Sequence, residues 1–355
     1  MKISFVADQM RMGGAERVVA SLSNEFVSLG HTVNIVMINE HESRSTYTLN
    51  KNVVLTPVKK PGTKNNAFEK ISLLRKVIKD IRPDILISFQ NHIHVFTHIA
   101  ACGLNIPHIV SERSDPEQYP KSKVMRILRS LIFKKASGCV YQTEYAKTFF
   151  SKKVQSKSIV IPNPIVLMCE PSGPFKREKR IVAVGRLAAP KNYDMMIRAF
   201  ALFSKRIPGY KLVICGEGEL RSHLESLAGE LDLADNIVLP GHLENPHEFV
   251  CGSSVFLLSS DFEGMPNALL EAMALGVPVV STDCLCGGLA ELISDGGNGL
   301  IVPVGDYKAM ADALVRVIRN PILSTNLSES ASLIRRDYSV ERIAERWLGY
   351  LKSLV

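Results

Sequence analysis

Short apolar runs alternate with amphipathic segments along the chain, and this alternation restricts the fold more than any other feature of the sequence. The apolar run 2–7 is followed by a glycine pair and then by residues 15–29, whose apolar side chains recur at helical spacing. Gly30 then stands where glycine is favoured after a helix. Strands that alternate with helices form a parallel sheet with helices on both faces. The other elements predicted in this half are strands at 32–38, 85–89 and 107–111 and a helix at 70–81.

A proline-rich segment interrupts this rhythm near the middle of the chain. Residues 161–165 read Ile-Pro-Asn-Pro-Ile, which forbids a helix and disfavours a central strand, and a Pro-, Gly- and Lys-rich stretch follows at 171–179. The alternation then starts again. The strands predicted there are 180–184, 211–215, 237–239, 255–258 and 278–281, and the helices are 193–206, 220–231, 267–275 and 308–319. Because 355 residues exceed one ordinary core, we predict an α/β protein with two doubly wound domains, 1–163 and 164–339.

The cysteines and the hydrophobic runs indicate the compartment. Seven cysteines are scattered through the chain without a CxxC motif, which is typical of reduced thiols rather than of a disulfide framework. The pair Cys284 and Cys286 lacks further ligands, so we predict no metal site. Residues 1–17 do not resemble a secretory signal, and no apolar run approaches the roughly 18 residues of a membrane span. We therefore expect a cytoplasmic protein.

The net charge of +8 is unevenly distributed. Residues 1–163 hold 24 Lys and Arg against 12 Asp and Glu, whereas the rest of the chain holds 19 against 23. A basic first half favours an anionic partner, such as a membrane surface, a phosphorylated acceptor or nucleic acid. The sequence contains no helix-turn-helix, zinc-binding or aromatic RNA-binding motif, which argues against nucleic acid.

Residues 121–135 form a basic amphipathic segment. Its apolar stripe consists of Val124, Ile127, Leu128, Leu131 and Ile132, and it is surrounded by Lys121, Lys123, Arg126, Arg129, Lys134 and Lys135. Such a helix can lie on an anionic membrane surface beside a lipid-linked acceptor. It can equally pack on the protein core with a solvated basic face. The sequence leaves both interpretations open.

Two glycine-containing turns follow predicted strands and precede helices. Gly13 and Gly14 allow a ligand to approach the backbone closely, and the helix that follows offers free N–H groups to an anion. The second turn contains Gly185 and Arg186, with Lys191 five positions further on. Two cations at a strand end suit a diphosphate, although two surface cations in a solvated loop would look the same.

A third group lies between residues 261 and 271. Glu263 falls in a loop and Glu271 in the helix that follows, and carboxylates accept hydrogen bonds from sugar hydroxyls. The backbone N–H groups of Asn267 and Ala268 begin that helix and suit a phosphate. Acidic residues that complement the helix dipole would explain part of this pattern.

In combination, these motifs resemble the retaining glycosyltransferases of family 4, which have the GT-B fold. The matching pieces are GGAER (13–17), VGRLAAPKN (184–192), CGEGELR (215–221), SSDFEGMPNALLEAMALGVPVVSTD (259–283) and NGLIVPVGD (298–306). Their order and spacing are more specific than any single piece. The resemblance implies two Rossmann-like domains facing a cleft. A last helix, predicted over 338–354, would cross back and bury Trp347 against the first domain, to which residues 340–355 are therefore assigned.

The resemblance also implies roles for individual residues. Arg186 and Lys191 would neutralise the donor diphosphate, Glu263 would hold the donor sugar, and these three form the predicted catalytic group. Glu271 would hold the ribose. The other predicted donor-binding residues are Gly13, Gly14, Gly185, His242, Leu243, Gly264, Met265, Pro266, Asn267 and Ala268. The family typically needs no metal, so no metal and no cofactor are expected.

The acceptor side departs from the family pattern. Many relatives carry a histidine at the end of a strand in the first domain, whereas here the strand is followed by Gln90, Asn91 and then His92. At the next strand end, Glu112 and Arg113 stand where many relatives have a histidine. His92, Glu112 and Arg113 are therefore the predicted acceptor-site residues.

The sequence thus predicts a retaining glycosyltransferase that moves a hexose or N-acetylhexosamine from a nucleotide sugar, UDP-linked as in most relatives, to a hydroxyl group. The expected acceptor is a glycan or lipid-linked intermediate of surface polysaccharide or oligosaccharide biosynthesis, reached at the inner face of the cell membrane. One alternative is a nucleotide-sugar epimerase of the same fold. Another is a basic, non-enzymatic anion-binding protein. The sugar, the acceptor, the linkage and the oligomeric state are not fixed by the residues.

Overall fold

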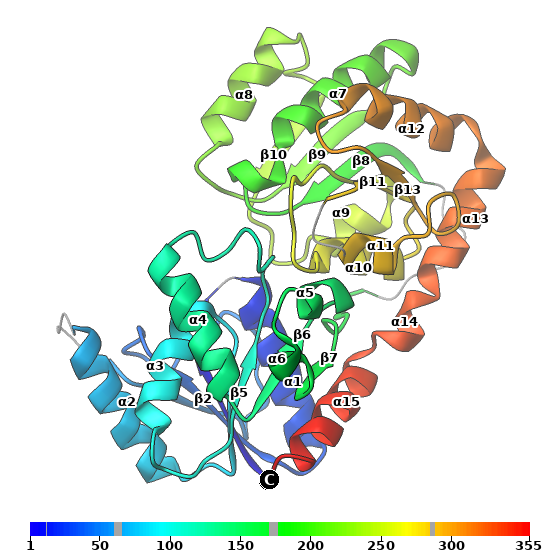
Figure 1. The fold of residues 1–355 in the computed structure, drawn as a ribbon. Coiled ribbons are helices and arrows are strands. Elements are labelled where there is room, and N and C mark those ends of the chain that lie inside the picture. Colours follow the sequence, from blue (N-terminus) through cyan, green and yellow to red (C-terminus); the bar gives the residue numbers. More distant parts are fainter. Residues whose placement is uncertain (12, 60–65, 170–176, 285–287) are drawn as a thin grey trace. The chain divides into compact units, whose positions relative to one another are not determined.

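The chain folds into two compact units (Figure 1). The structure is a computed structural model that describes residues 1–11, 13–59, 66–169, 177–284 and 288–355. Unit 1 comprises Met1–Pro164 and Tyr338–Val355, and unit 2 comprises Ile165–Asp337. This division differs from the predicted boundaries by one residue at the first crossing and by two at the second. Most of the stretch 171–179 lies outside the described residues, as does Cys286.

Unit 1 is built on a sheet of seven parallel strands in the order β3-β2-β1-β4-β5-β6-β7. The strands are β1 (Lys2–Ala7), β2 (Thr32–Met37), β3 (Val54–Pro57), β4 (Ile85–Ser88), β5 (His108–Ser111), β6 (Gly138–Tyr141) and β7 (Ser158–Val160). The helices are α1 (Gly14–Ser28), α2 (Ala67–Ile81), α3 (Asn91–Ala101), α4 (Lys123–Lys135), α5 (Glu144–Thr148), α6 (Lys152–Gln155) and α15 (Val340–Lys352).

Both faces of this sheet are covered, because successive side chains of a strand point to opposite faces. Ile3 and Phe5 of β1 belong to the apolar cluster formed with α1 and α15. Val6 belongs to the cluster on the other face, with Leu74 of α2 and Ile93 of α3. The apolar runs of the sequence are therefore continuous because both of their faces are buried, as the prediction of a doubly wound sheet required.

The last helix belongs to the core of unit 1. Trp347 of α15 is completely buried, and its ring stacks on Phe89 with the centroids 5.8 Å apart. The hydroxyl of Tyr350 donates to the carbonyl of Lys157 at 2.6 Å and accepts from the backbone N–H of Cys139 at 3.0 Å. The predicted return of the chain to its first domain and the burial of Trp347 are confirmed.

Unit 2 repeats the same architecture with six parallel strands in the order β10-β9-β8-β11-β12-β13. The strands are β8 (Glu178–Val184), β9 (Lys211–Cys215), β10 (Ile237–Gly241), β11 (Ser253–Leu258), β12 (Val279–Thr282) and β13 (Leu300–Val302). The helices are α7 (Tyr193–Arg206), α8 (Arg221–Glu230), α9 (His247–Cys251), α10 (Asn267–Ala274), α11 (Gly288–Leu292), α12 (Tyr307–Arg319), α13 (Pro321–Ser332) and α14 (Ile334–Asp337).

In each sheet the strand order reverses at one place. The reversal lies between β1 and β4 in unit 1 and between β8 and β11 in unit 2. Open sheets of this kind bind ligands beyond the carboxyl ends of their strands at such a point. The loops that follow these four strands are therefore where the functional residues are expected. No helix among the described residues combines the length and the apolar character that a membrane span requires.

Candidate active site

The loops that follow β8 and β11 are joined by hydrogen bonds at the strand-order reversal of unit 2. The Ser259 hydroxyl donates to the carbonyl of Lys191 at 2.7 Å, and the backbone N–H of Asp261 donates to the carbonyl of Pro190 at 2.9 Å. The side-chain amide of Asn192 donates to Asp261 at 2.7 Å. Asn192 has a φ of 46°, a left-handed conformation that asparagine tolerates better than most residues. The two loops therefore form one framework for the side chains that they carry.

Lys191 and Glu263 form an ion pair within this framework. The Lys191 ammonium donates to Glu263 Oε1, which also accepts from the Ser260 hydroxyl at 2.7 Å. Both side chains are partly exposed, at 23% for Lys191 and 16% for Glu263. The structure thus brings together the predicted phosphate-binding cation and the predicted sugar-binding carboxylate. An ammonium has three donors, so its pairing with Glu263 is compatible with a further acceptor.

The turn that carries Arg186 is set by two glycines in close contact. Gly216 has a φ of 156°, and a Cβ atom there would lie 1.9 Å from the carbonyl oxygen of Gly185. The N–H of Gly185 donates to the carbonyl of Cys215 at 3.0 Å, and the N–H of Gly216 donates to that of Gly241 at 2.9 Å. The ends of β8, β9 and β10 therefore lie close together. The Arg186 carbonyl accepts from the N–H of Ala188 at 2.9 Å, whereas the Arg186 side chain is exposed and, within the described part of the chain, makes no hydrogen bond or ion pair.

Glu271 lies on α10, the helix that follows the β11 loop. Its carboxylate is buried, and Oε2 lies 2.9 Å from Nε2 of the buried His247 on α9. The backbone N–H of Met168 donates to the other ring nitrogen, Nδ1, at 3.0 Å. Because Nδ1 accepts a hydrogen bond, the ring proton lies on Nε2 and points at Glu271. His247 thus fixes the orientation of the carboxylate.

The remaining predicted donor residues of unit 2 lie along the same carboxyl edge of the sheet. His242 and Leu243 directly follow β10, and the His242 side chain is exposed. Residues 264–266 lie between β11 and α10, and α10 begins at Asn267. The first backbone N–H groups of a helix have no partner within the helix, so those of Asn267 and Ala268 suit an acceptor group.

In unit 1 the strand-order reversal carries a second polar group. Gly13 precedes α1, and its N–H donates to the hydroxyl oxygen of Tyr47 at 2.9 Å while its carbonyl accepts from that hydroxyl at 2.8 Å. Gly14 is the first residue of α1. Glu16 in the first turn accepts from the Gln90 side chain at 2.6 Å, and burial raises the pKa of this carboxyl. The Glu16–Gln90 hydrogen bond thus joins the segments that follow β1 and β4, in the way that the loops after β8 and β11 are joined in unit 2.

His92 also lies at the strand-order reversal of unit 1, on the helix α3 that follows β4. Its Nε2 is 3.4 Å from Oδ1 of Asp8, which follows β1, and half of the His92 side chain is exposed. This hydrogen bond is the main reason why the pKa of Asp8 lies below its ordinary value. Asn39, which follows β2, also donates to Asp8. His92 is therefore in a position to meet a ligand at the edge of the sheet.

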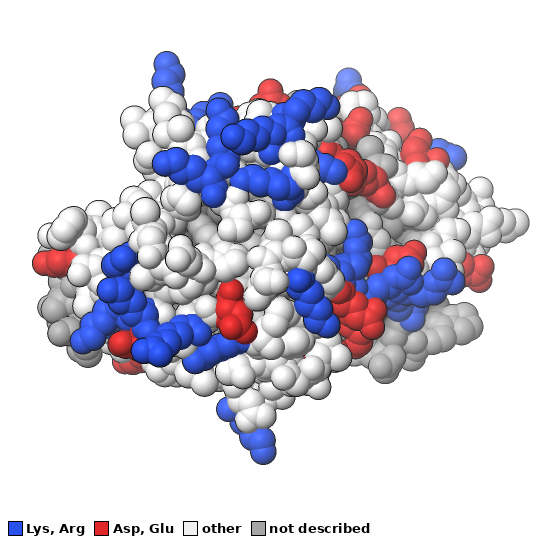
Figure 2. Space-filling model, turned by 60° about the horizontal axis from the view of Figure 1, so that its bottom comes forward, with Lys and Arg blue, Asp and Glu red and all other residues white. Residues whose placement is uncertain are grey.

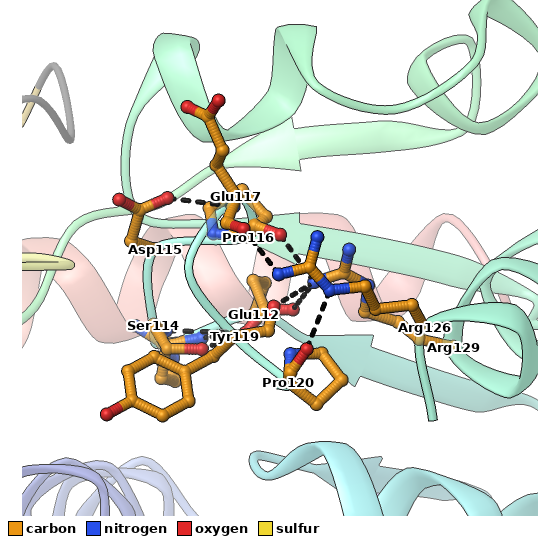
Figure 3. Close-up of polar contacts among 10 residues, drawn as sticks. Glu112, Ser114, Asp115, Pro116, Glu117, Tyr119, Pro120, Arg126 and Arg129 are labelled. Atoms are coloured by element: carbon orange, nitrogen blue, oxygen red, sulfur yellow. Dashed lines mark hydrogen bonds and ion pairs between the residues drawn. The ribbon is translucent and has the colours of Figure 1, made fainter. Parts of the chain in front are cut away.

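Glu112 belongs to a different network, which is buried (Figure 3). Its Oε1 accepts from the Ser114 hydroxyl at 2.7 Å, and its Oε2 lies 3.7 Å from the guanidinium of Arg129 on α4. Arg129 also donates to the carbonyls of Pro116, at 2.9 Å, and Tyr119. Burial raises the pKa of Glu112, and the Arg129 charge opposes that effect. This carboxylate therefore holds the loop 112–120 to α4.

Arg113 is also held inside unit 1. Its guanidinium lies 4.4 Å from the ring centroid of Phe89 and 5.6 Å from that of Trp347, and it donates to Asn163 at 2.8 Å. Burial lowers the pKa of Arg113 to about 9. The three predicted acceptor residues thus do not form one group. Of the three, His92 has the most accessible position, and the acceptor role of each stays a prediction.

Known proteins match this chain over nearly its whole length. Residues 12–168 match the family model Glycosyltransferase Family 4, and residues 169–333 match the model Glycosyl transferases group 1. The GalNAc-alpha-(1->4)-GalNAc-alpha-(1->3)-diNAcBac-PP-undecaprenol alpha-1,4-N-acetyl-D-galactosaminyltransferase of Campylobacter jejuni is 30% identical over 363 residues, which cover 100% of this chain and 99% of that protein. The chain belongs to glycosyltransferase family 4.

A second relative agrees with this family assignment, and a solved structure shows the fold of the glycosyltransferase. The N-acetylgalactosamine-N,N'-diacetylbacillosaminyl-diphospho-undecaprenol 4-alpha-N-acetylgalactosaminyltransferase of the same bacterium is 28% identical, and the match covers 99% of each chain. HepE of Anabaena, in complex with UDP-glucose, superposes with a TM-score of 0.83 at 16% identity and covers 99% of this chain and all of its own. The structural match shows the fold, and the two Rossmann-like units are those of the GT-B class.

Proposed function

We propose that this glycosyltransferase moves a sugar from a UDP-sugar to a hydroxyl of a lipid-linked or polymeric glycan, with retention of the anomeric configuration. The observation that carries the proposal is the Lys191–Glu263 pair beside the exposed Arg186, at the strand-order reversal of unit 2. A cation pair and a carboxylate in adjacent loops match the two chemistries of a nucleotide sugar, its diphosphate and its hydroxyls.

Each part of the donor has a matching group in unit 2. Arg186 and Lys191 would bind the diphosphate and stabilise the negative charge that grows as UDP leaves. Glu263, oriented by Ser260, would accept from the hydroxyls of the sugar. Glu271, oriented by His247, would accept from those of the ribose. In this assignment His242 and Leu243 flank the base.

The reaction proposed here takes place on one face of the sugar. The acceptor hydroxyl bonds to the anomeric carbon as the bond from that carbon to the UDP oxygen breaks, and a phosphate oxygen of the departing UDP takes the hydroxyl proton. No protein nucleophile is assigned. Because Arg186 and Lys191 supply the positive charge, we propose that transfer proceeds at full rate in excess EDTA.

The acceptor proposal rests on relatives and on charge. The two Campylobacter jejuni proteins are named for transfer to sugars on undecaprenyl diphosphate. Residues 1–163 of this chain hold twice as many basic as acidic residues, which favours an anionic, diphosphate-linked acceptor. Among the predicted acceptor residues, the exposed His92 is the one we assign to acceptor contact.

Binding of nucleotides tests the donor site directly. Calorimetry with UDP, UDP-glucose, UDP-N-acetylglucosamine and UDP-N-acetylgalactosamine should identify one preferred UDP-sugar. Arg186→Gln and Lys191→Met should each weaken binding about tenfold or more, since each removes a charged hydrogen bond worth roughly 1.5–3 kcal/mol. Lys211→Gln is the matched control, because Lys211 is an exposed cation at the opposite end of the same sheet. Binding of no nucleotide at millimolar concentration would contradict the proposal.

A second experiment separates transfer from epimerisation. An epimerase converts its donor without an acceptor, whereas a transferase releases UDP at the full rate only when the acceptor is present. The preferred UDP-sugar should therefore persist alone and be consumed when membrane extracts that contain lipid-linked oligosaccharides are added. Conversion of the donor alone into a second nucleotide sugar would instead support the epimerase alternative.

We also propose that α4 attaches the enzyme to an anionic membrane surface. The side chains of Val124, Ile127 and Leu131 are 66%, 62% and 49% exposed, although Ile132 and Phe133 on the same helix are buried. The exposed side chains are flanked by a basic patch, which consists of Lys121, Lys123, Arg126, Lys134 and Lys135 together with Lys152 and Lys153 of the adjacent α6. Figure 2 shows Lys and Arg side chains gathered in groups on one face of the molecule. Arg129, expected in this basic face, is instead buried against Glu112.

An apolar strip within a cationic surface matches an anionic bilayer, which offers both an interior and negative headgroups. The enzyme should sediment with phosphatidylglycerol vesicles at low salt and dissociate at high salt. Val124→Ser with Ile127→Ser should abolish sedimentation. The matched control is Ile322→Ser with Leu333→Ser, which removes two apolar side chains of unit 2 that are somewhat more exposed than Val124 and Ile127. Equal sedimentation with neutral phosphatidylcholine vesicles would contradict the electrostatic part of the proposal.

A further inference from the structure

Two cysteine thiols lie in contact in unit 2. Cys169 and Cys251 are 82 positions apart in the sequence, and their Sγ atoms are 2.9 Å apart. Both side chains are partly exposed, so a small oxidant can reach them. A disulfide has an S–S bond of about 2.05 Å, so closing this pair requires the sulfurs to approach by only about 0.9 Å.

The other described cysteines lie in different surroundings. Cys139, Cys215 and Cys284 are buried, and burial raises the pKa of Cys139 to about 12 and that of Cys215 to about 11, which makes these thiols poor nucleophiles. Cys102 is exposed and lies in unit 1. Among the described cysteines, Cys169 and Cys251 are therefore the pair that can be joined without a rearrangement of the fold.

This pair is connected to the proposed donor site by a short path. Cys251 is the last residue of α9 and His247 is the first. Cys169 directly follows Met168, whose backbone N–H donates to Nδ1 of His247 at 3.0 Å. Nε2 of the same ring lies 2.9 Å from Glu271. A bond between Cys169 and Cys251 therefore joins the helix that carries His247 to the segment that donates to its ring.

We propose that Cys169 and Cys251 form a reversible disulfide and that this bond weakens binding of the nucleotide sugar. The oxidant is a peroxide. The Cys169 sulfur attacks one peroxide oxygen, which breaks the O–O bond and gives a sulfenic acid and water. The Cys251 sulfur then attacks the Cys169 sulfur and displaces a second water, so that two thiols and one hydrogen peroxide give one disulfide and two waters. A dithiol reductant restores both thiols.

The order of the two sulfurs follows from their surroundings. Burial is the main reason why the pKa of Cys251 rises to about 12, so Cys251 is seldom a thiolate. We therefore assign the second step, attack on the sulfenic acid, to Cys251 and the reaction with peroxide to Cys169. Contact between the two sulfurs compensates for the low thiolate fraction of Cys251, because the second step is intramolecular.

The first measurement does not depend on the proposed function. The full-length protein is treated with hydrogen peroxide, its free thiols are alkylated, and its peptides are mapped by mass spectrometry. A peptide pair joined through Cys169 and Cys251, with the loss of two hydrogens, is expected in the wild type and in Cys102→Ser. Cys169→Ser and Cys251→Ser should each lack it. Alkylation of both cysteines after oxidation, or a bond to another cysteine, would overturn the proposal.

The second measurement tests the coupling and rests on the proposed function. The dissociation constant for UDP is measured on reduced and oxidised protein, and we expect oxidation to raise it about fivefold, at the lower end of couplings between sites. Cys251→Ser should bind UDP equally before and after peroxide. An unchanged dissociation constant in protein that contains the disulfide would overturn the coupling. Failure of the reduced protein to bind UDP would instead count against the proposed function, and the peptide map would still decide whether the disulfide forms.

Discussion

The Nε2–H of His247 points at the carboxylate of Glu271 across 2.9 Å, and both side chains are almost completely buried. The Met168 backbone N–H donates a hydrogen bond to the other ring nitrogen, Nδ1, at 3.0 Å, so the ring cannot rotate without losing two hydrogen bonds. A carboxylate proposed to hold a ribose is thus oriented by an imidazole ring that is itself held in place. Orientation of this kind reduces the entropy that the carboxylate loses when a ligand binds.

Replacement of His247 should therefore affect the nucleotide more than the fold. In His247→Leu, the charged carboxylate of Glu271 loses the hydrogen bond from the imidazole, and a hydrogen bond to a charged group is worth about 1.5–3 kcal/mol. We expect UDP to bind about tenfold more weakly, and His247→Gln, which retains a donor near Glu271, to recover part of that loss. Calorimetric titration with UDP measures both variants.

His223→Leu is the control, because His223 also pairs with a carboxylate, that of Asp194, but half of its side chain is exposed. This variant should bind UDP as the wild type does. Equal UDP affinity in His247→Leu and the wild type would separate Glu271 from the donor site, because a carboxylate that binds the ligand cannot lose its orientation without a cost.

The buried pair of Glu112 and Arg129 should control the stability of unit 1. Removing one member of a buried ion pair leaves the other charge without compensation and costs about 3–5 kcal/mol, so Arg129→Met should lower the free energy of unfolding by this amount. Glu112→Gln with Arg129→Met should cost less than Arg129→Met alone, because no buried charge remains. Lys134→Met, which removes an exposed cation from the same helix, should be nearly neutral. Urea unfolding followed by the fluorescence of Trp347, the single tryptophan of the chain, measures all three.

The pH dependence of Arg129→Met gives a second check. A carboxyl whose folded pKa lies above its unfolded value binds its proton more tightly in the folded state, so its contribution to stability is present at low pH and is lost as the pH rises through the folded pKa. Burial already raises the pKa of Glu112, and loss of Arg129 should raise it further. Arg129→Met should therefore be less destabilising at pH 5 than at pH 8. A destabilisation independent of pH would show that packing, rather than charge, is what Arg129 supplies.

Much of the fold could be predicted because buried strands and amphipathic helices leave regular apolar patterns. Among the elements that the prediction did not name are β3, β6, β7, β13 and α3, and two of them, β3 and α3, show why. β3 lies at the edge of its sheet with its side chains partly exposed, so its four residues lack a continuous apolar run. α3 follows β4 after only two residues, and its histidines obscure the apolar spacing. Elements with weak burial patterns give weak sequence signals.

In the candidate site, residues that lie in sequence motifs could be predicted, whereas partners that only the fold brings near could not. Glu263 and Lys191 could be selected because each lies in a recognisable motif, and the structure shows that they pair. His247 could not, because its contact with Glu271 spans 24 positions and involves no motif. Glu112 could be selected as a polar residue at a strand end. Its partner Arg129 could not, because in the sequence Arg129 is one of several cations on an amphipathic helix.

Acid should destabilise unit 1 through two buried histidines. Ser88 Oγ lies 2.7 Å from Nδ1 of His94 and 2.8 Å from Nε2 of His108, and the ring of His98 lies beside that of His108. Burial lowers the pKa of His108 to about 3 and also lowers that of His94. Because these rings bind protons only after unfolding, stability should fall as the pH drops below the unfolded pKa of about 6.5.

Each such histidine contributes a slope of about 1.4 kcal/mol per pH unit between pH 6 and pH 4. His108→Gln should reduce the measured slope by about this amount, whatever its effect on stability at pH 8. Urea titrations at several pH values measure the slopes, and an identical slope in His108→Gln and the wild type would contradict the assignment of the acid sensitivity to this cluster.

The attachment of α15 to the sheet depends on the absence of a side chain at Gly138. A Cβ atom there would lie 2.2 Å from the Tyr350 hydroxyl and 2.8 Å from a methyl group of Leu354. Gly138→Ala should therefore cost about 1–3 kcal/mol, as overpacking does, by displacing the hydroxyl from Cys139 and Lys157. Gly349→Ala is the matched control, because a Cβ atom on that face of α15 meets no other atom within 4 Å. It should stabilise the helix by roughly 0.5–1 kcal/mol.

A double-mutant cycle decides whether the Tyr350 hydroxyl is the group that clashes with a Cβ atom at position 138. Tyr350→Phe alone should destabilise unit 1, because the Cys139 N–H and the Lys157 carbonyl lose their partner. If the clash with Gly138→Ala is with the hydroxyl, the double variant should be more stable than the sum of the two changes predicts, by about 0.5–3 kcal/mol. Urea unfolding followed by Trp347 fluorescence reports on α15 itself, since this ring lies one turn before Tyr350. Strict additivity would mean that Leu354, rather than the hydroxyl, excludes a side chain at position 138.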